Sequence, residues 1–304
     1  MPRAYLHYDV FTRDPLVGNQ LAVFTDGRGL SDRTMQAIAR EMNFSESTFV
    51  LPAEAAGTDV RMRIFTPAQE LPMAGHPTIG STFALAETGV IRAGASRFVF
   101  GLGVGPTPVD LEWDDTRLRF AWMTQPLPAF GSVLHDGAAV AAALGVSESD
   151  LAPLPVQPVS CGVPYLLVPL RDRAAVDRAV SDAAACRRLA AVLGESLPIF
   201  LFAVGGSASE TRPTPFRVYS RMFAPEFGIV EDPATGSASG PLGCYLVEHG
   251  VVTPEQAAAI ISDQGVAMGR ASRIHVAIAG TADAITHVRV GGEAVLVGRG
   301  ELLV

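Results

Sequence analysis

The sequence contains little cysteine and no recognisable metal-binding pattern. Its three cysteines, Cys161, Cys186 and Cys244, are an odd number, lie far apart and form no CxxC pair, which excludes a disulfide framework and a zinc-finger type of site. The six histidines do not fall in ligand spacing, and no HExxH motif accompanies them, so no metal site is expected. We therefore predict buried free thiols and no bound metal.

Long apolar runs and basic clusters are also missing. No run of 18 apolar residues occurs, and the N-terminus MPRAYLHYDVF alternates like a strand, so we predict no membrane span, no signal peptide and a cytoplasmic location. The formal net charge is −8, and the arginines do not cluster, which argues against nucleic acid or an anionic membrane surface as a partner. A small molecule is the expected partner.

The composition supports a large hydrophobic core. Hydrophobic residues make up 48% and charged residues 18% of a 304-residue chain, and this length exceeds what one core usually supports. A proline-rich stretch, TQPLPAFG, predicts a linker. We therefore predict an N-terminal domain of residues 1–123 and a C-terminal domain of residues 124–297, with the last strand, 298–304, returning to the N-terminal domain.

Two segments about half a chain apart resemble each other. Residues 63–67 (RIFTP) match residues 221–225 (RMFAP), and residues 72–76 (PMAGH) match residues 233–237 (PATGS) after three extra residues in the second copy. Each copy continues into an apolar helical stretch. This spacing is too long for a solenoid repeat, so we predict two similar halves that face each other.

Each matched segment places a glycine at the start of a helix. The first turn of a helix has unpaired backbone N–H groups at the positive end of the helix dipole, which suits an anion. Gly75 and Gly236 would let a ligand approach the backbone closely, and His76 and Ser237 would add side-chain hydrogen bonds. Two such helix ends would hold a carboxylate. An ordinary tight turn followed by a capped helix is the alternative.

Two acidic positions are candidates for chemistry. Glu46 stands in the otherwise apolar or hydroxyl-bearing segment MNFSESTFVL, where burial would let it carry a proton near neutral pH and act as acid and base. A glutamate on the solvent face of the strand is the alternative. Asp232 precedes the second glycine turn, where it either stabilises the helix N-terminus or orients His76 and keeps it positively charged beside a substrate carboxylate.

Four blocks of the sequence together resemble one protein family. The blocks YDVFTRDPLVGNQLAVF, EMNFSESTFVLP, RIFTPAQELPMAGHPTIGS and EDPATGSASGPLGCYL are similar to those of the phenazine-biosynthesis PhzF-like proteins. The resemblance covers nearly the whole chain. It implies the α+β diaminopimelate-epimerase-like fold, in which each of two pseudo-symmetric halves wraps a barrel-like sheet round a central helix.

The resemblance also implies a function. It implies an isomerase that needs no cofactor, moves a proton between carbons of a small carboxylate-bearing substrate in a cleft between the halves, and forms a homodimer. A non-catalytic carboxylate-binding protein, an epimerase and a hydro-lyase are the alternatives; neither glycine turn contains the cysteine that two-thiol epimerases use. The implied catalytic residues are Glu46, His76 and Asp232, and the implied substrate-binding residues are Ser45, Gly75, Gly236 and Ser237.

Overall fold

The chain forms two compact units. The computed structural model describes residues 2–205, 215–282 and 284–304, and the units are Met1–Gln125 with Arg289–Val304, and Pro126–Val288. The first boundary falls after Gln125, the last residue of a strand, where the sequence placed it after residue 123. The returning segment begins at Arg289 instead of residue 298, because the strand that carries it continues from one unit into the other. That the units act as separate domains stays a prediction.

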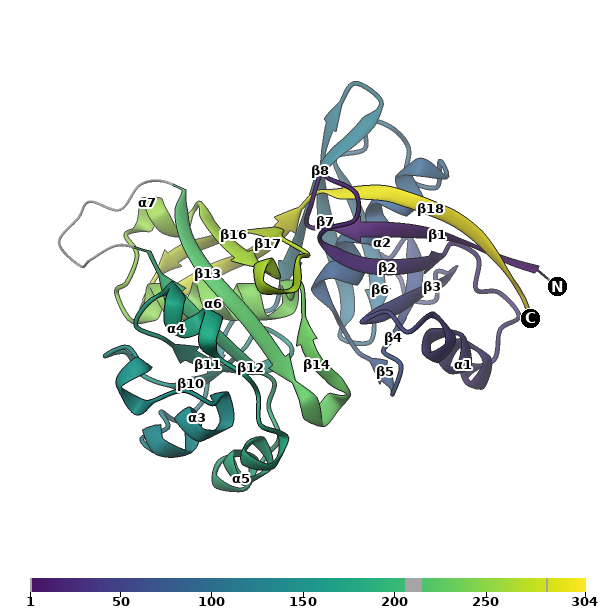
Figure 1. Ribbon diagram of the computed structural model, residues 1–304. Coiled ribbons are helices and arrows are strands. Elements are labelled where there is room, and N and C mark those ends of the chain that lie inside the picture. Colours follow the sequence, from purple (N-terminus) through teal and green to yellow (C-terminus); the bar gives the residue numbers. More distant parts are fainter. Residues whose placement is uncertain (1, 206–214, 283) are drawn as a thin grey trace. The chain divides into compact units, whose positions relative to one another are not determined.

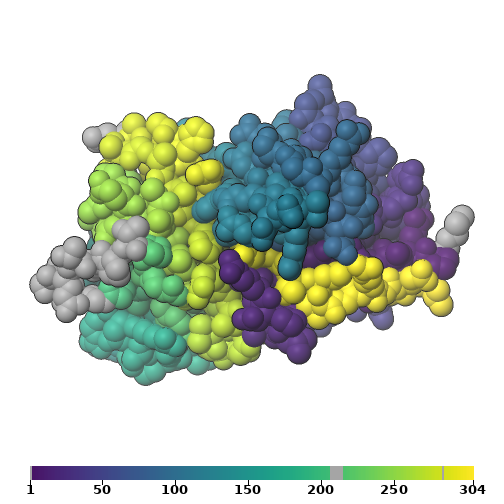
Figure 2. Space-filling model, turned by 90° about the horizontal axis from the view of Figure 1, so that it is seen from above, coloured from purple at the N-terminus to yellow at the C-terminus, as the bar shows by residue number. Residues whose placement is uncertain are grey.

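The first unit is a twisted sheet with two helices. The C-terminal strand lies antiparallel beside the N-terminal one, with Leu303 opposite Pro2 (Figures 1 and 2). The strands are β1 (Pro2–Val10), β2 (Asn19–Phe24), β3 (Glu46–Pro52), β4 (Val60–Phe65), β5 (Glu70–Leu71), β6 (Arg97–Leu102), β7 (Gly105–Asp114), β8 (Arg117–Gln125) and β18 (Ala294–Leu303), and the helices are α1 (Asp32–Met42) and α2 (Gly75–Glu87).

The second unit contains further strands and more helices. Strand β17 (Ala284–Gly292) begins here and ends in the first unit. The other strands are β9 (Ala129–Phe130), β10 (Gln157–Ser160), β11 (Pro164–Pro169), β12 (Ile199–Val204), β13 (Phe216–Ala224), β14 (Ile229–Asp232), β15 (Ile260–Gln264) and β16 (Ser272–Thr281), and the helices are α3 (Gly137–Leu144), α4 (Arg173–Arg178), α5 (Ala183–Leu193), α6 (Gly236–Glu248) and α7 (Pro254–Ala257). Short 3₁₀ helices cover Glu148–Asp150, Pro225–Phe227 and Val266–Met268.

The strand pairings of the first unit recur in the second. β2 pairs with β3 in parallel as β11 pairs with β12, and β3 pairs with β4 antiparallel as β12 pairs with β13. β4 and β13 each pair antiparallel with a short following strand and in parallel with the next long one, β6 or β15. The matched sequence segments fall at the ends of β4 and β13. The internal similarity predicted from them is therefore a similarity of topology.

A buried helix lies at the centre of each unit (Figure 1). α2 contacts β1, β2, β3, β8 and β18, and α6 contacts β10, β11 and β16. Both helices are 13 residues long, with small or apolar side chains on all sides, as expected for a helix enclosed by a sheet. A Cβ at Gly80 would lie 2.6 Å from the Leu21 side chain, and one at Gly243 would lie 2.7 Å from Val276. Glycine thus lets each helix approach its strands closely.

The peripheral helix α1 shows the contrasting pattern. Its N-cap residue Ser31 accepts a hydrogen bond from the backbone N–H of Thr34, at 3.1 Å, as the sequence pattern for an N-cap predicts. Only one face of α1 is buried, with Met35, Ile38 and Ala39 pointing inward. Among the described helices, none is long and apolar enough to span a membrane.

Candidate active site

Glu46 is the first residue of β3 and is buried. It pairs with Leu21 of β2 in parallel, while the next residue, Ser47, lies opposite Phe65 of β4. Strands on both sides thus enclose the start of β3, and Glu46 is only 8% exposed. The alternative of a solvent-facing glutamate therefore does not apply. Ser45, immediately before the strand, is half-buried.

His76, at the second position of α2, lies against this carboxyl group. Its Nδ1 atom is 3.3 Å from Oε2 of Glu46 and 3.2 Å from Nδ2 of Asn19, at the start of β2. His76 is 3% exposed. Burial lowers its pKa to about 3, because a charged imidazolium would lose its hydration. Burial therefore favours the neutral ring. A nearby anion, either an ionised Glu46 or a substrate carboxylate, would offset the cost of the positive charge that the sequence hypothesis gave it.

The other nitrogen of this ring points to a place where a ligand could bind. Nε2 of His76 is buried and has no hydrogen-bond partner within residues 2–205, 215–282 and 284–304. Leaving such a group unsatisfied costs roughly 1–3 kcal/mol. A bound ligand could satisfy it. The sequence predicted Glu46 and His76 but missed Asn19, whose only signal is the Gly-Asn pair at the end of the β1–β2 turn.

The helices α2 and α6 differ from the other α-helices at their N-termini. Five α-helices of the described chain have an N-cap side chain that accepts a backbone hydrogen bond; the N-caps are Ser31, Asp136, Asp172, Asp182 and Thr253. The N-caps of α2 and α6, Ala74 and Thr235, make no such bond, and neither helix has an acidic residue in its first turn. These two helices begin at Gly75 and Gly236, the positions that the sequence singled out as candidate anion sites. That they bind an anion stays a prediction.

In the second unit, hydroxyl groups and a carboxylate surround the tip of α6. Asp232, 4% exposed, accepts a hydrogen bond at Oδ2 from the Thr235 hydroxyl at 2.5 Å. The hydroxyl groups of Ser237 and Tyr165 lie 2.6 Å apart. Asp232 and Ser237 were predicted from the sequence, whereas Thr235 and Tyr165 were missed because ordinary hydroxyl-bearing residues give no sequence signal.

The structure thus places the predicted residues in two groups. Ser45, Glu46, Gly75 and His76 lie together in the first unit, and Asp232, Gly236 and Ser237 lie together in the second. In the described ranges, no group of three His, Cys, Asp or Glu side chains could hold a metal ion. All three cysteines are buried, as predicted, and the Cys161 and Cys244 sulfurs lie 3.8 Å apart.

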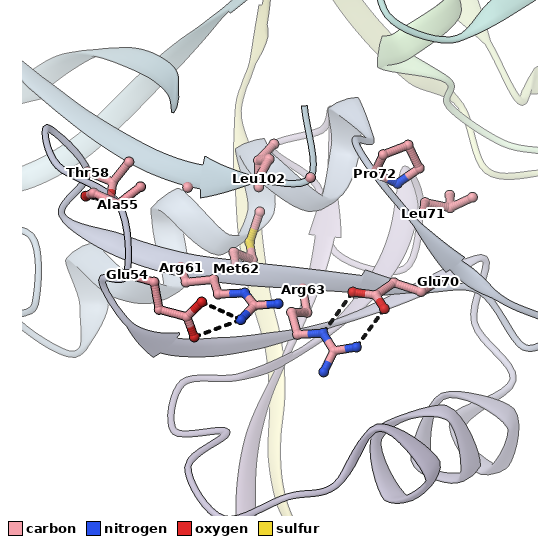
Figure 3. Close-up of a pocket in the computed structure, with 12 residues that line it drawn as sticks. Glu54, Ala55, Thr58, Arg61, Met62, Arg63, Glu70, Leu71, Pro72 and Leu102 are labelled. Atoms are coloured by element: carbon pink, nitrogen blue, oxygen red, sulfur yellow. Dashed lines mark hydrogen bonds and ion pairs between the residues drawn. The ribbon is translucent and has the colours of Figure 1, made fainter. Parts of the chain in front are cut away.

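A separate groove of about 520 Å³ opens beside β4 in the first unit. Figure 3 shows that its guanidinium groups are paired: Arg61 with Glu54, and Arg63 with Glu70. Because carboxylates of this chain neutralise both arginines, the groove offers no unpaired charge for an anionic ligand. None of the predicted site residues lines it.

The fold first defines the class of protein. A hydroxyproline epimerase from Agrobacterium vitis, 15% identical, superposes with a TM-score of 0.65 over 99% of this chain and 91% of that one; at this identity the likeness concerns the fold alone. The architecture is therefore the predicted diaminopimelate-epimerase-like fold, which the hydroxyproline epimerase shares.

The family is narrower than the fold. The chain belongs to the family of phenazine biosynthesis-like proteins, whose model matches residues 8–300. It is 37% identical to a trans-2,3-dihydro-3-hydroxyanthranilate isomerase from Pseudomonas chlororaphis over 98% of this chain and 99% of that one. A PhzF-family protein from Bacillus anthracis, 26% identical, superposes with a TM-score of 0.86 over 100% of both chains. The predicted family is confirmed, and the chain is an isomerase of this family.

Proposed function

We propose that this isomerase moves a proton between two carbons of a small cyclic carboxylate, with Glu46 as the acid and base and without a cofactor. The observation that carries the proposal is the buried carboxyl group of Glu46, 3.3 Å from Nδ1 of the neutral His76. A relative's name supplies the substrate class, since trans-2,3-dihydro-3-hydroxyanthranilate is a cyclic carboxylate.

In the proposed reaction, the Glu46 carboxylate removes a proton from one ring carbon. The electron pair of the broken C–H bond moves into the conjugated system, Glu46 then returns the proton to another carbon, and the resulting enol becomes a ketone. The substrate keeps its atoms and its oxidation state, so the reaction consumes no co-reactant. We assign His76 and Asp232 to the catalytic residues together with Glu46.

We propose that the two helix tips hold the substrate carboxylate. The N-termini of α2 and α6, at Gly75 and Gly236, would supply backbone N–H groups, with Ser45 and Ser237 adding hydroxyl donors. That the two helix tips share one cleft stays a prediction from the matched segments.

Replacing Glu46 tests the proposal. Glu46→Gln keeps the shape of the side chain but cannot take up a proton, so turnover and deuterium incorporation from heavy water should fall by roughly 10²–10⁴-fold, while the substrate still binds. Steady-state kinetics, mass spectrometry and calorimetry measure these three quantities. Thr48→Val is the matched control, since Thr48 lies on the same strand and bonds Ser81 at 2.9 Å; it should stay active. Normal turnover in Glu46→Gln would remove Glu46 from the mechanism.

Product analysis separates the remaining alternatives. Tight binding of a carboxylate without any deuterium exchange would indicate a non-catalytic binding protein. A product of inverted configuration would indicate an epimerase, and loss of water would indicate a hydro-lyase. The homodimer and the cytoplasmic location implied by the resemblance stay predictions; light scattering of the purified protein tests the first and cell fractionation the second.

A further inference from the structure

A buried glutamine fixes the loop that carries Asp232. Gln264, the last residue of β15, is 0% exposed. Its Oε1 accepts a hydrogen bond from the backbone N–H of Thr235 at 3.0 Å, and its Nε2 donates to the carbonyl of Asp232 at 2.8 Å and to the hydroxyl of Thr235 at 3.0 Å. One side chain thus makes three hydrogen bonds to the connection between β14 and α6.

The chemistry of these groups determines the direction of each hydrogen bond. A backbone N–H can only donate, so the atom of Gln264 that faces Thr235 N must be the oxygen, and the amide NH₂ must face the other two partners. The Thr235 hydroxyl accepts from this NH₂ and gives its own proton to Asp232, whose Oδ2 lies 2.5 Å away. The amide, the hydroxyl and the carboxylate therefore form a chain that orients Asp232 as an acceptor.

The first unit has the same arrangement of strand end, glycine and proline, but it lacks this amide. A glycine follows the equivalent strand in each unit. A Cβ at Gly103 would lie 2.8 Å from Pro72 Cα, and a Cβ at Gly265 would lie 2.5 Å from the Pro233 carbonyl oxygen, so each glycine lets the strand end lie close to the proline that begins the matched segment. Leu102 precedes the first glycine, and Gln264 precedes the second. The equivalent position therefore carries an apolar side chain in the first unit and an amide that bonds the loop in the second.

We propose that Gln264 is a positioning residue for the reaction: acting through Thr235, it holds the Asp232 carboxylate in its working orientation. This rests on the proposed role of Asp232 in catalysis. A buried polar network is costly when one member is missing, and a carboxylate displaced by about 1 Å can cost roughly 10²-fold in rate.

Substitutions at both ends of the hydrogen-bonded chain test the proposal. Gln264→Leu introduces the side chain found at the first unit's equivalent position. Its kcat should fall by roughly 10²-fold, because Asp232 loses its orientation. Its KM should change little, because the groups proposed to bind the substrate carboxylate are unchanged. Thr235→Val should behave like Gln264→Leu, and Thr235→Ser, which keeps the hydroxyl, should restore kcat. If Gln264→Leu does not fold, the Thr235 pair still gives the answer.

The matched control is Ser262→Ala. Ser262 lies two residues earlier on the same strand, is fully buried and bonds Ser220 at 2.8 Å, so its loss reports the effect of removing any buried hydrogen bond from β15; kcat should stay normal. An inactive Asp232→Asn beside a normal kcat in Gln264→Leu or Thr235→Val would overturn the inference and leave the proposed function standing. Normal turnover in Asp232→Asn would remove Asp232 from the proposed function and the inference with it.

Discussion

The two units share one strand topology but have different side chains at equivalent positions. Phe65 lies opposite Ser47 in the first unit, and its sequence match Phe223 lies opposite Ile199 in the second. Ser47 and Ile199 are therefore equivalent, and the residue before each gives the pair Glu46 and Pro198. The second unit thus has proline, which cannot exchange a proton, where the first has its buried carboxyl group.

The neighbouring positions differ in the same way. His76 at the tip of α2 corresponds to Ser237 at the tip of α6, and the register of β2 and β11 makes Leu21 equivalent to Tyr165. The first unit therefore places an imidazole beside its carboxyl group, and the second places two hydroxyl groups in hydrogen-bonding contact. The comparison indicates that strand starts and helix tips can change while the topology is kept, since they contribute little to the pairing of strands.

Both units have an arginine–glutamate ion pair at equivalent positions, and the two pairs differ in how deeply they are buried. Arg63 pairs with Glu70 across β4 and β5 and lies 5.1 Å from the Phe65 ring centre; Arg221 pairs with Glu231 across β13 and β14 and lies 4.8 Å from that of Phe223. The partner carboxylates differ, because the side chain of Glu70 is 41% exposed and that of Glu231 is 14% exposed.

The largest expected effect comes from giving the first helix tip the residue of the second. His76→Ser should lower kcat/KM by roughly 10²–10⁴-fold, the range of a lost acid–base partner, because Glu46 loses the ring 3.3 Å away. Steady-state kinetics measure the loss. Ser81→Ala, on the same helix, is the control and should keep its activity. Full activity in His76→Ser would show that the imidazole is not needed.

The ion pair found in both units should contribute more to the free energy of unfolding in the second unit. Arg221→Met leaves Glu231 buried and unpaired and removes donors to the carbonyl groups of Val176 and Ala179, so unfolding should become about 3–5 kcal/mol easier. Arg63→Met leaves the more exposed Glu70 in contact with water, and its cost should be about 0–1 kcal/mol. Urea denaturation measures both; equal losses would contradict the role of burial.

A smaller difference is expected at the two glycines that pack on prolines. Gly265 has a φ of +73°, and a Cβ there would lie 2.4 Å from the carbonyl of Arg270. Gly265→Ala should therefore cost about 2–5 kcal/mol, from left-handed strain together with overpacking. Gly103→Ala meets only the overpacking and should cost about 1–3 kcal/mol. Thermal unfolding compares them, and a Gly103→Ala variant less stable than Gly265→Ala would reverse the expected order.

Burial of His76 in the first unit should make the stability of the protein depend on pH. Burial lowers the pKa of His76 to about 3 from 6.5, so between these values the unfolded chain binds a proton that the folded chain does not. Stability should therefore fall as pH falls from 6.5 toward 3, by up to about 1.4 kcal/mol per pH unit. His76→Ser should remove this contribution, measured by urea denaturation across that range, whereas the exposed His287→Ser should not. Identical pH slopes in wild type and His76→Ser would contradict a neutral, buried ring.

The duplicated architecture could be predicted from the sequence because it depends on local patterns. The matched RIFTP and RMFAP segments, the glycines that open α2 and α6, and the apolar surfaces of these helices are all visible without coordinates. The same patterns made Glu46, His76, Asp232 and Ser237 candidates, since a carboxylate in an apolar strand and a polar residue after a helix-opening glycine are unusual locally. The family resemblance then supplied the fold and the isomerase activity.

The sequence could not reveal which side chains meet those residues. Asn19 reaches His76 from the start of β2, and Gln264 reaches Asp232 and Thr235 from the end of β15; each partner lies tens of residues away along the chain. The returning segment was placed at residue 298 instead of Arg289 for a similar reason, because the length of β17 depends on the strand it pairs with.

The sequence by itself determined that two similar α+β halves each place a glycine at the tip of a buried helix, because hydrophobic period and turn residues are local properties. The tertiary structure alone decided that Glu46 is buried against the His76 ring and that Gln264 bonds the loop that carries Asp232. Burial and hydrogen-bond partners depend on distant strands, and their register fixes which polar atoms can pair.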